Sequence, residues 1–170
     1  MDQELFDINQ KIAGTIEKYS DMVRRICFLY LNNSTDVDDV FQDVFLKLLQ
    51  NKSQFKSSEH EKAWIIRVTI NKCKDILKSF WRKKIDLTEN MEVQSMFNFE
   101  DKAENELLNV VLSLPDKYKD VIYLYYYEEY TVPEIAKLLK KKENTIYSHL
   151  HRARGLVKEK LGGDKDEYSY

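Results

Sequence analysis

The sequence predicts an all-α fold made of two small helical domains. Only four glycines and two prolines occur in 170 residues, which is too few for the many turns of a β-sandwich or a barrel. Lys, Glu, Leu and Ile are abundant, as is typical of helical proteins. Apolar residues recur every three or four positions over most of the chain, the period of an amphipathic helix. A chain of this length holds one domain or two small ones, so the position of a linker decides between them.

The N-terminal thirty residues carry the first apolar pattern. It predicts one or two helices that end near the turn at Asn32 and Asn33. A second helix follows to about Gln50, with Thr35 and Asp38 as a capping box at its start. Its apolar stripe consists of Val37, Val40, Phe41, Val44, Phe45 and Leu48.

Residues 51–57 break the helical period, and a third helix begins after them. Ser58 and Glu61 form a second predicted capping box. These patterns predict a first domain over residues 1–81. From residue 82 to residue 102 acids dominate and the apolar residues lose helical spacing, which predicts a flexible acidic linker. The buried side of the third helix is expected to include Trp64, Ile65, Val68, Cys73, Ile76, Leu77 and Phe80.

Helical spacing resumes at Ala103 and predicts a second domain over residues 103–161, followed by a tail over 162–170. Pro115 and Asp116, together with Ser113, mark the start of another helix. The apolar positions of these two helices are Leu107, Leu108, Val111, Leu112, Val121, Ile122, Leu124 and Tyr125.

The C-terminal part has the pattern of a helix-turn-helix. Thr131 and Glu134 form a capping box around Pro133, which predicts a short helix to about Leu139. Three lysines, 140–142, form the turn, and a second helix buries Ile146, Leu150, Ala153 and Val157. Its opposite face holds Asn144, Ser148, His151 and Arg152, with Tyr147 at the edge.

The side chains on that outward face have the hydrogen-bonding groups that read base edges in a DNA groove. Arg154, Lys158 and the lysine turn suit phosphates, which hold a protein in register without reading sequence. An ordinary helical hairpin with a solvated polar face is the alternative interpretation.

Charge is distributed unevenly, although the formal net charge is only -2. Residues 64–85 hold seven bases and one acid, and residues 131–161 hold eight bases and three acids. Residues 86–106, between them, hold seven acids and one base. The basic segments coincide with the third helix and the helix-turn-helix, which favours nucleic-acid binding over chance clustering on solvated faces.

Nothing in the sequence indicates a catalytic site, a metal site or a cofactor. Cys27 and Cys73 are isolated, so we expect reduced core thiols rather than a disulfide or a zinc site. His149 and His151 point to different sides of one helix and cannot chelate a metal together, and His60 is expected at the surface. The N-terminus lacks a signal peptide and no apolar run is long enough for membrane insertion, which predicts a cytoplasmic protein.

The segment from Leu114 to Leu161 resembles the C-terminal domain of bacterial sigma factors, especially the extracytoplasmic-function type. Many response regulators share such a helix-turn-helix, so the first domain has to distinguish a sigma factor from a response regulator. There, DVDDVFQDVFLKLLQ and AWIIRVTINKCKDILKSFWRKK resemble the polymerase-clamp helix and the minus-10-reading helix of the same family, in the same order. The resemblance extends from about Ile12 to Leu161. It implies a subunit that binds core RNA polymerase, through its clamp coiled coil and its flap, and directs transcription initiation at promoter DNA.

The resemblance also implies roles for residues of the first domain. The helix with Asp39, Gln42, Asp43 and Phe45 would dock on the polymerase clamp, although acids at a helix start can also serve the helix dipole. A flipped base of the minus-10 element would enter a pocket of the loop with Ser53, Gln54 and Phe55, unless Phe55 belongs to the core. Asn71 and Asp75 would face the same element, and the phosphates would contact Arg67, Lys72, Lys74 and Lys78.

In the second domain, the family's minus-35 base-reading positions correspond to Tyr147, Ser148, His151 and Arg152, and backbone contacts correspond to Thr145 and Arg154. The sequence departs from the family within the turn, where the usual glycine is absent, and at Tyr147 and His149, where basic residues are usual. These departures affect which promoter sequence is recognised, and they do not affect the predicted fold.

Two other functions compete with this interpretation. A free-standing helix-turn-helix regulator would leave the clamp-like helix without a role. A nuclease that uses the aspartates near Asp39 with a metal would need partnering His or Lys residues in a cleft, and the sequence lacks that pattern. Family analogy suggests a separate anti-sigma protein as a further partner.

Overall fold

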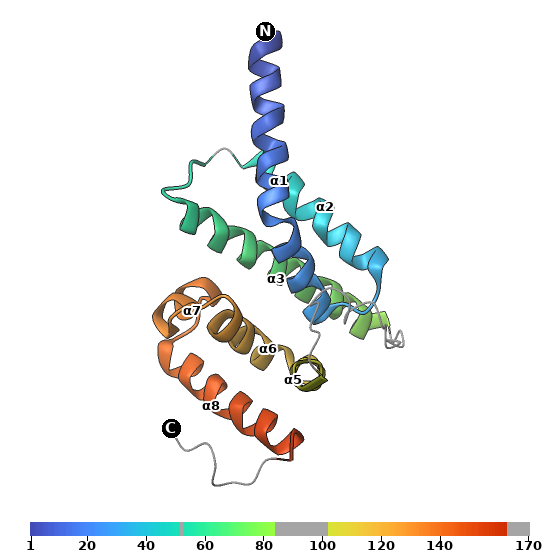
Figure 1. The fold of residues 1–170 in the computed structure, drawn as a ribbon, viewed down its shortest axis with the longest axis vertical. Helices are drawn as coiled ribbons and strands as arrows, with labels where there is room; N and C mark the ends of the chain where they lie inside the picture. Colours follow the sequence, from blue (N-terminus) through green and yellow to red (C-terminus); the bar gives the residue numbers. More distant parts are fainter. Residues whose placement is uncertain (52, 84–101, 163–170) are drawn as a thin grey trace. The chain divides into compact units, whose positions relative to one another are not determined.

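A computed structural model of the chain describes residues 1–51, 53–83 and 102–162, and every regular element among them is helical (Figure 1). The all-α prediction is therefore confirmed. The chain divides into two compact units, Met1–Phe97 and Asn98–Tyr170. Most of the predicted linker and of the predicted tail lies outside the described residues. None of the described helices combines the length and the hydropathy that a membrane crossing requires.

The first unit consists of three helices that pack against one another in pairs: α1 (Asp2–Tyr30), α2 (Ser34–Gln50) and α3 (Ser58–Lys83). The first apolar pattern is thus one continuous helix. Its N-terminal half extends beyond α2 and α3 (Figure 1) and exposes Leu5, Phe6 and Ile8. The core contains side chains that are at most 2 % exposed: Val23, Ile26, Leu31, Val37, Val40, Val44, Ile65, Ile66, Ile70 and Cys73.

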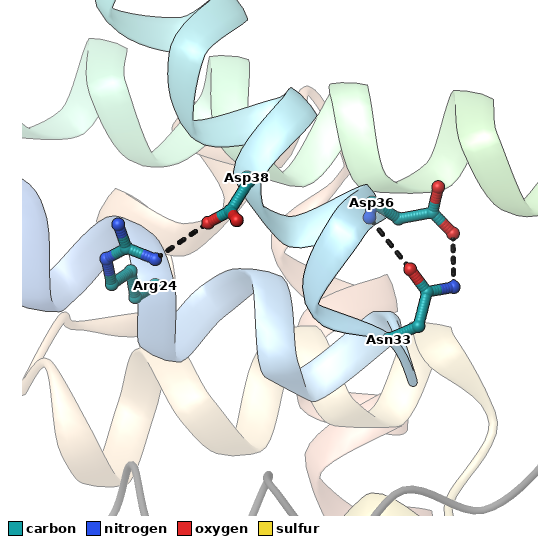
Figure 2. A network of polar contacts seen from close by, with 4 residues as sticks. All are labelled: Arg24, Asn33, Asp36 and Asp38. Atoms are coloured by element: carbon teal, nitrogen blue, oxygen red, sulfur yellow. Dashed lines mark hydrogen bonds and ion pairs between the residues drawn. The ribbon is translucent and has the colours of Figure 1, made fainter.

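The capping box predicted for α2 is wrong. Asn33 caps this helix, because its side-chain oxygen accepts the backbone N–H of Asp36 at 2.8 Å. The amide group of Asn33 also donates to the Asp36 carboxylate at 2.7 Å (Figure 2). Thr35 therefore lies inside the first turn, and Asp38 lies just after it. Asn is a stronger cap than Thr, and Asn33 belongs to the turn that the sequence predicted before this helix.

The capping box predicted for α3 is also wrong. The Ser57 hydroxyl accepts the backbone N–H of His60 at 3.1 Å, so the cap lies one residue before Ser58. The Glu61 carboxylate accepts the hydroxyl of Tyr19 from α1 at 3.0 Å. A contact between two helices thus takes the acid that the sequence pattern had assigned to a local cap.

The second unit contains α5 (Lys102–Leu112), α6 (Asp116–Ile122), the π-helical turn η1 (Tyr123–Tyr127), α7 (Val132–Leu139) and α8 (Glu143–Lys160). The helix starts agree with the sequence predictions, whereas the π-helical turn was not predicted. The long helix α8 packs against α5, α6 and α7. The core of this unit includes Leu108, Leu114, Tyr118, Val121, Leu124, Ile135, Ile146, Leu150 and Ala153.

Candidate nucleic-acid interface

The capping box predicted for α7 is confirmed. The Thr131 hydroxyl accepts the Glu134 N–H at 3.4 Å, and the Glu134 carboxylate accepts the Thr131 N–H at 2.8 Å. The Thr131 hydroxyl also donates to this carboxylate, at 2.9 Å. The two donations from Thr131, by its N–H and its hydroxyl, favour the ionised carboxylate and lower the pKa of Glu134. The cap fixes the direction in which α7 enters the helix-turn-helix.

The turn between α7 and α8 depends on one left-handed residue. Lys140 ends α7 with φ 54° and ψ 49°, and the N–H of Lys141 donates to the carbonyl of Ala136 at 2.9 Å. Glycine is the usual residue in this conformation because a Cβ raises its energy. Lysines 140–142 are all exposed, so the turn presents three positive charges at the start of α8.

Helix α8 separates a buried face from a polar outward face, as its spacing predicts. Ile146, Leu150 and Ala153 are at most 1 % exposed, and Val157 is half-buried. Tyr147 is 57 % exposed and Thr145 is half-buried. The remaining predicted base-reading residues are all exposed, namely Asn144, Ser148, His151 and Arg152.

The two bases on the flank of α8 differ in their surroundings. Arg154 is exposed, and its Nε donates to the hydroxyl of Tyr126 at 2.5 Å. Its guanidinium also lies against the rings of Tyr125 and Tyr126, at 5.5 and 5.6 Å from their centroids. Lys158 is half-buried. No sequence pattern predicted these tyrosine contacts, because Tyr126 and Arg154 are 28 residues apart.

Charged and polar groups also lie beneath the helix-turn-helix. Asp120 on α6 is 1 % exposed, and burial raises the pKa of its carboxyl to about 7, against the opposing effect of Lys141. His149 packs edge-on against Tyr118, with ring centroids 5.7 Å apart. Burial and the charges of Lys141, Lys117 and Arg152 lower the pKa of His149, which keeps the imidazole neutral near pH 7. Sequence reasoning missed Asp120, although its spacing of three and four residues from Tyr123 and Leu124, both buried, was a signal of burial.

A second polar face lies on α3. Arg67 and Lys74 are half-buried, and Asn71, Asp75 and Lys78 are exposed. Their spacing of three and four residues places them along one side of the helix. The opposite side belongs to the core through Ile66, Ile70, Cys73 and Leu77. Three of the four predicted phosphate-contacting residues, Arg67, Lys74 and Lys78, therefore share one accessible face. Lys72 lies off this face and pairs with Asp43 of α2.

The loop before α3 lines a cavity of about 410 Å³. Ser53, Gln54 and Phe55 all contribute to its wall, together with residues of α1 and α2. Phe55 is half-buried and packs edge-on against His60 and Trp64, with centroids 5.5 and 5.7 Å away. The remaining lining residues are mainly apolar: Ile8, Lys11, Ile12, Thr15, Ile16, Phe45, Leu48, Leu49, Asn51 and Glu61.

His60 in the first turn of α3 is exposed, as predicted, and it also contacts this loop. Its Nδ1 accepts the backbone N–H of Lys56 at 3.2 Å. Together with the ring contact to Phe55, this bond fixes the loop to the first turn of α3.

Helix α2 presents a mixed acidic and apolar stripe. Asp39, Gln42 and Asp43 are exposed. The assignment of Phe45 to this surface is wrong, because its side chain is only 5 % exposed and packs into the core. Sequence reasoning missed Leu46, which is 54 % exposed on the same side of the helix. An apolar residue that stays exposed beside acids could have been found from its spacing of three and four residues from Asp43 and Gln42.

Two ion pairs join α2 to the neighbouring helices. Arg24 donates to Asp38 at 3.1 Å (Figure 2), and its guanidinium lies 4.4 Å from the ring centroid of Phe41. Asp43 pairs with Lys72 of α3 at 3.6 Å. Among the described residues, no group of three acidic, His or Cys side chains is arranged to hold a metal ion.

Comparison with known families matches both units. Residues 15–83 match the family model of sigma-70 region 2, and residues 104–156 match that of sigma-70 region 4. The chain is similar in fold to the sigma factor RpoE from Bartonella quintana, solved with the anti-sigma factor NepR, with a TM-score of 0.67 and 17 % identity over 94 % of this chain and 99 % of that one. It is also similar in fold to CnrH, solved with the cytosolic domain of CnrY, with a TM-score of 0.64 and 19 % identity over 92 % of this chain and 91 % of that one.

Relatives of known name support the same assignment. The ECF RNA polymerase sigma factor SigW of Bacillus subtilis is 25 % identical over 167 residues, with 88 % of each chain covered. The sigma factor SigV of the same organism is 26 % identical over 137 residues, with 81 % of this chain and 82 % of that one covered. With both regions matched in order along the chain, this protein belongs to the sigma-70 family, as a sigma factor of the extracytoplasmic-function type.

Proposed function

We propose that this chain is a dissociable specificity subunit that binds core RNA polymerase and directs it to promoters. The polymerase carries out all bond making, and the chain itself is not an enzyme. The observation that carries the proposal is the presence of two outward polar faces, on α3 and α8, in two units that match successive regions of one family. Its place of action is the cytoplasm, where polymerase and DNA meet.

In this proposal, α8 reads the minus-35 element. The exposed amide, hydroxyl, imidazole and guanidinium groups of its outward face can bond to base edges in a major groove. The lysine turn, Arg154 and Lys158 contact phosphates and hold the helix in register. Thr145 is assigned to the DNA backbone. The reading face consists of Asn144, Tyr147, Ser148, His151 and Arg152.

The first unit reads and opens the minus-10 element. The cavity beside Phe55 is large enough for a nucleobase and combines an apolar wall with the polar side chains of Ser53 and Gln54. Such a pocket offsets the few kcal/mol that unstacking of a base costs. Asn71 and Asp75 face the same strand in this proposal, and Arg67, Lys74 and Lys78 neutralise its phosphates.

The polymerase clamp docks on the outer stripe of α2. Acidic side chains beside exposed leucines suit a partner helix that carries both basic and apolar residues. The stripe consists of Asp39, Gln42, Asp43, Leu46 and Leu49. The second unit provides the contact with the polymerase flap.

A separate inhibitory chain completes the proposed set of partners. One of the solved structures that are similar in fold contains a sigma factor bound to an anti-sigma factor, and another contains CnrH bound to the cytosolic domain of CnrY. We infer that an anti-sigma protein also controls this chain, by covering one of its polymerase-binding or DNA-binding surfaces.

Reconstituted transcription tests the proposed function. DNA with randomised upstream and downstream elements is incubated with the chain and core polymerase, and the retained fragments serve as templates. We expect transcripts from the selected DNA only when both the chain and core polymerase are present. Matched controls lack either component or use scrambled minus-35 or minus-10 sequences.

One outcome would favour a free-standing regulator instead. In that case the chain alone would bind a discrete duplex sequence tightly, and core polymerase would neither change that binding nor yield transcripts. The absence of both DNA selection and transcripts would contradict any function in initiation.

A further inference from the structure

Two consecutive tyrosines hold an arginine of α8 in one orientation. Arg154 donates from Nε to the hydroxyl of Tyr126 at 2.5 Å, and its guanidinium carbon lies 5.5 Å from the Tyr125 ring centroid and 5.6 Å from that of Tyr126. The two rings contact each other edge to face, with centroids 4.9 Å apart and planes at 76°. The guanidinium thus has a hydrogen bond to Tyr126 and aromatic contacts with both tyrosines.

The π-helical turn supplies this pair of rings. The N–H of Glu128 donates to the carbonyl of Tyr123 at 3.1 Å, five residues earlier, which closes the wide turn η1. Tyr125 and Tyr126 are consecutive residues of this turn, and both contact the one guanidinium. Such turns are often found at functional sites.

The contacts leave Arg154 able to bind a further group. A guanidinium has five N–H donors, and Tyr126 accepts from the single donor on Nε. Arg154 is exposed, so its terminal nitrogens can reach solvent. Along α8 it lies two turns after Tyr147 and one turn before Lys158, on the flank next to the outward face.

We propose that Tyr126, supported by Tyr125, is a positioning residue that orients Arg154 for a phosphate of the upstream promoter element, an inference that rests on the proposed function of α8. A free arginine side chain loses rotamer entropy when it binds a phosphate. Because the tyrosines already restrict Arg154 in the unbound protein, less entropy is lost on binding. The contact does not depend on base identity, since a phosphate is present at every step.

The test uses the holoenzyme and the full chain with Tyr126→Phe, which keeps the ring and removes the acceptor. Binding to a panel of single-base variants of the upstream element is measured at several salt concentrations. We expect about 2- to 5-fold weaker binding across the whole panel, as follows from loss of one exposed hydrogen bond to a charged group. Tyr127→Phe is the matched control, because it removes a hydroxyl from the same turn and its ring stacks on Tyr123, with centroids 5.2 Å apart. This variant should bind like the parent.

A second pair of variants shows whether the effect passes through Arg154. The Arg154→Lys variant keeps the charge but lacks the Nε–H donor. In this background Tyr126→Phe should change binding by less than about 1.5-fold, because the effects of substitutions at two coupled residues do not add. Thermal unfolding of each variant is measured in parallel. The proposal is overturned if Tyr126→Phe lowers the melting temperature while DNA binding well below that temperature stays unchanged, since the pair would then only join η1 to α8.

The outcomes also separate this inference from the function on which it rests. If the parent holoenzyme selects no promoter, the proposed function itself is disproved. If the parent binds and Arg152→Ala weakens it, but Arg154→Ala has no effect, the proposed function stands and the role of Tyr126 is disproved.

Discussion

At the scale of single residues, two positions of the second unit have a left-handed backbone without being glycine. Glu129 has φ 59° and Lys140 has φ 54°. A residue with a Cβ is less stable in this conformation than glycine, by about 1 kcal/mol. Lys140→Gly should therefore raise the free energy of unfolding of the second unit by about 0.5–1 kcal/mol, measured by chemical denaturation.

Lys141→Gly provides the matched control for this prediction. It removes the same charge from the neighbouring position of the turn, which has no positive φ. This variant should be no more stable than the parent, because glycine adds backbone entropy to the unfolded chain. Equal stabilisation by both variants would show that relief of charge repulsion, and not backbone conformation, is the cause.

The outward face of α8 leads to a prediction on promoter specificity. Arg152→Ala should cost about 1–3 kcal/mol at the preferred minus-35 element and little on other sequences, because a guanidinium that bonds to a guanine edge discriminates bases. Lys158→Ala should weaken binding to every sequence similarly, because it removes a phosphate contact. It should also lower by about one the slope of the logarithm of the binding constant against the logarithm of the salt concentration. Holoenzyme binding to single-base variants at several salt concentrations measures both effects. Equal losses for Arg152→Ala on all sequences would show a purely electrostatic role.

Burial of Asp120 predicts how the second unit responds to pH. Its carboxyl has a folded pKa of about 7 against an ordinary value of 3.8, so the folded state keeps a proton that the unfolded chain has released. Stability should therefore fall between about pH 4 and pH 7 and stay constant above. A rise of about three pKa units corresponds to a loss of about 4 kcal/mol in the free energy of unfolding.

Asp120→Asn tests this prediction, because an amide cannot ionise. The free energy of unfolding of this variant should fall less between about pH 4 and pH 7, and at pH 8 the variant should be more stable than the parent. Parallel stability profiles of the two proteins between pH 5 and pH 8 would contradict the prediction.

At the scale of elements, the outer stripe of α2 should determine affinity for core polymerase. Asp39→Lys combined with Leu46→Ala removes one charge contact and one apolar contact, and should weaken binding at least about tenfold. Asp43 is left in place because it pairs with Lys72 and supports α3. Binding of labelled chain to core polymerase is measured, and the helical signal is checked by circular dichroism.

A charge change elsewhere in the first unit controls for this effect. Asp21→Lys alters an exposed acid of α1 and should leave polymerase binding unchanged. If the double variant of α2 binds as tightly as the parent while remaining folded, the clamp docks on another surface.

At the scale of the whole molecule, the two units are expected to fold independently. The acidic segment 82–102 lacks the apolar spacing that would join two cores. Limited proteolysis should cut first in this segment and release two helical fragments, each with its own unfolding transition. Earlier cleavage within α2 or α8, with an intact connecting segment, would contradict the two-domain prediction.

Much of the fold could be predicted because the signals for a helix come from residues that are close together in the sequence. Apolar spacing gave the helices of both units, and the spacing of Ile146, Leu150 and Ala153 correctly separated the buried and outward faces of α8. The capping box of Thr131 and Glu134 was also found, since its partners are three residues apart. These features depend on interactions within one or two turns, so the sequence by itself determined them.

Other features were decided by tertiary contacts. Glu61 bonds to Tyr19 across two helices instead of capping its own, and Phe45 turns into the core instead of outward. The cavity beside Phe55 needs walls from three helices, and the tyrosines of η1 orient Arg154 across the second unit. Each of these arrangements joins residues far apart in the chain, and the packing that brings them together leaves no periodic trace in the sequence.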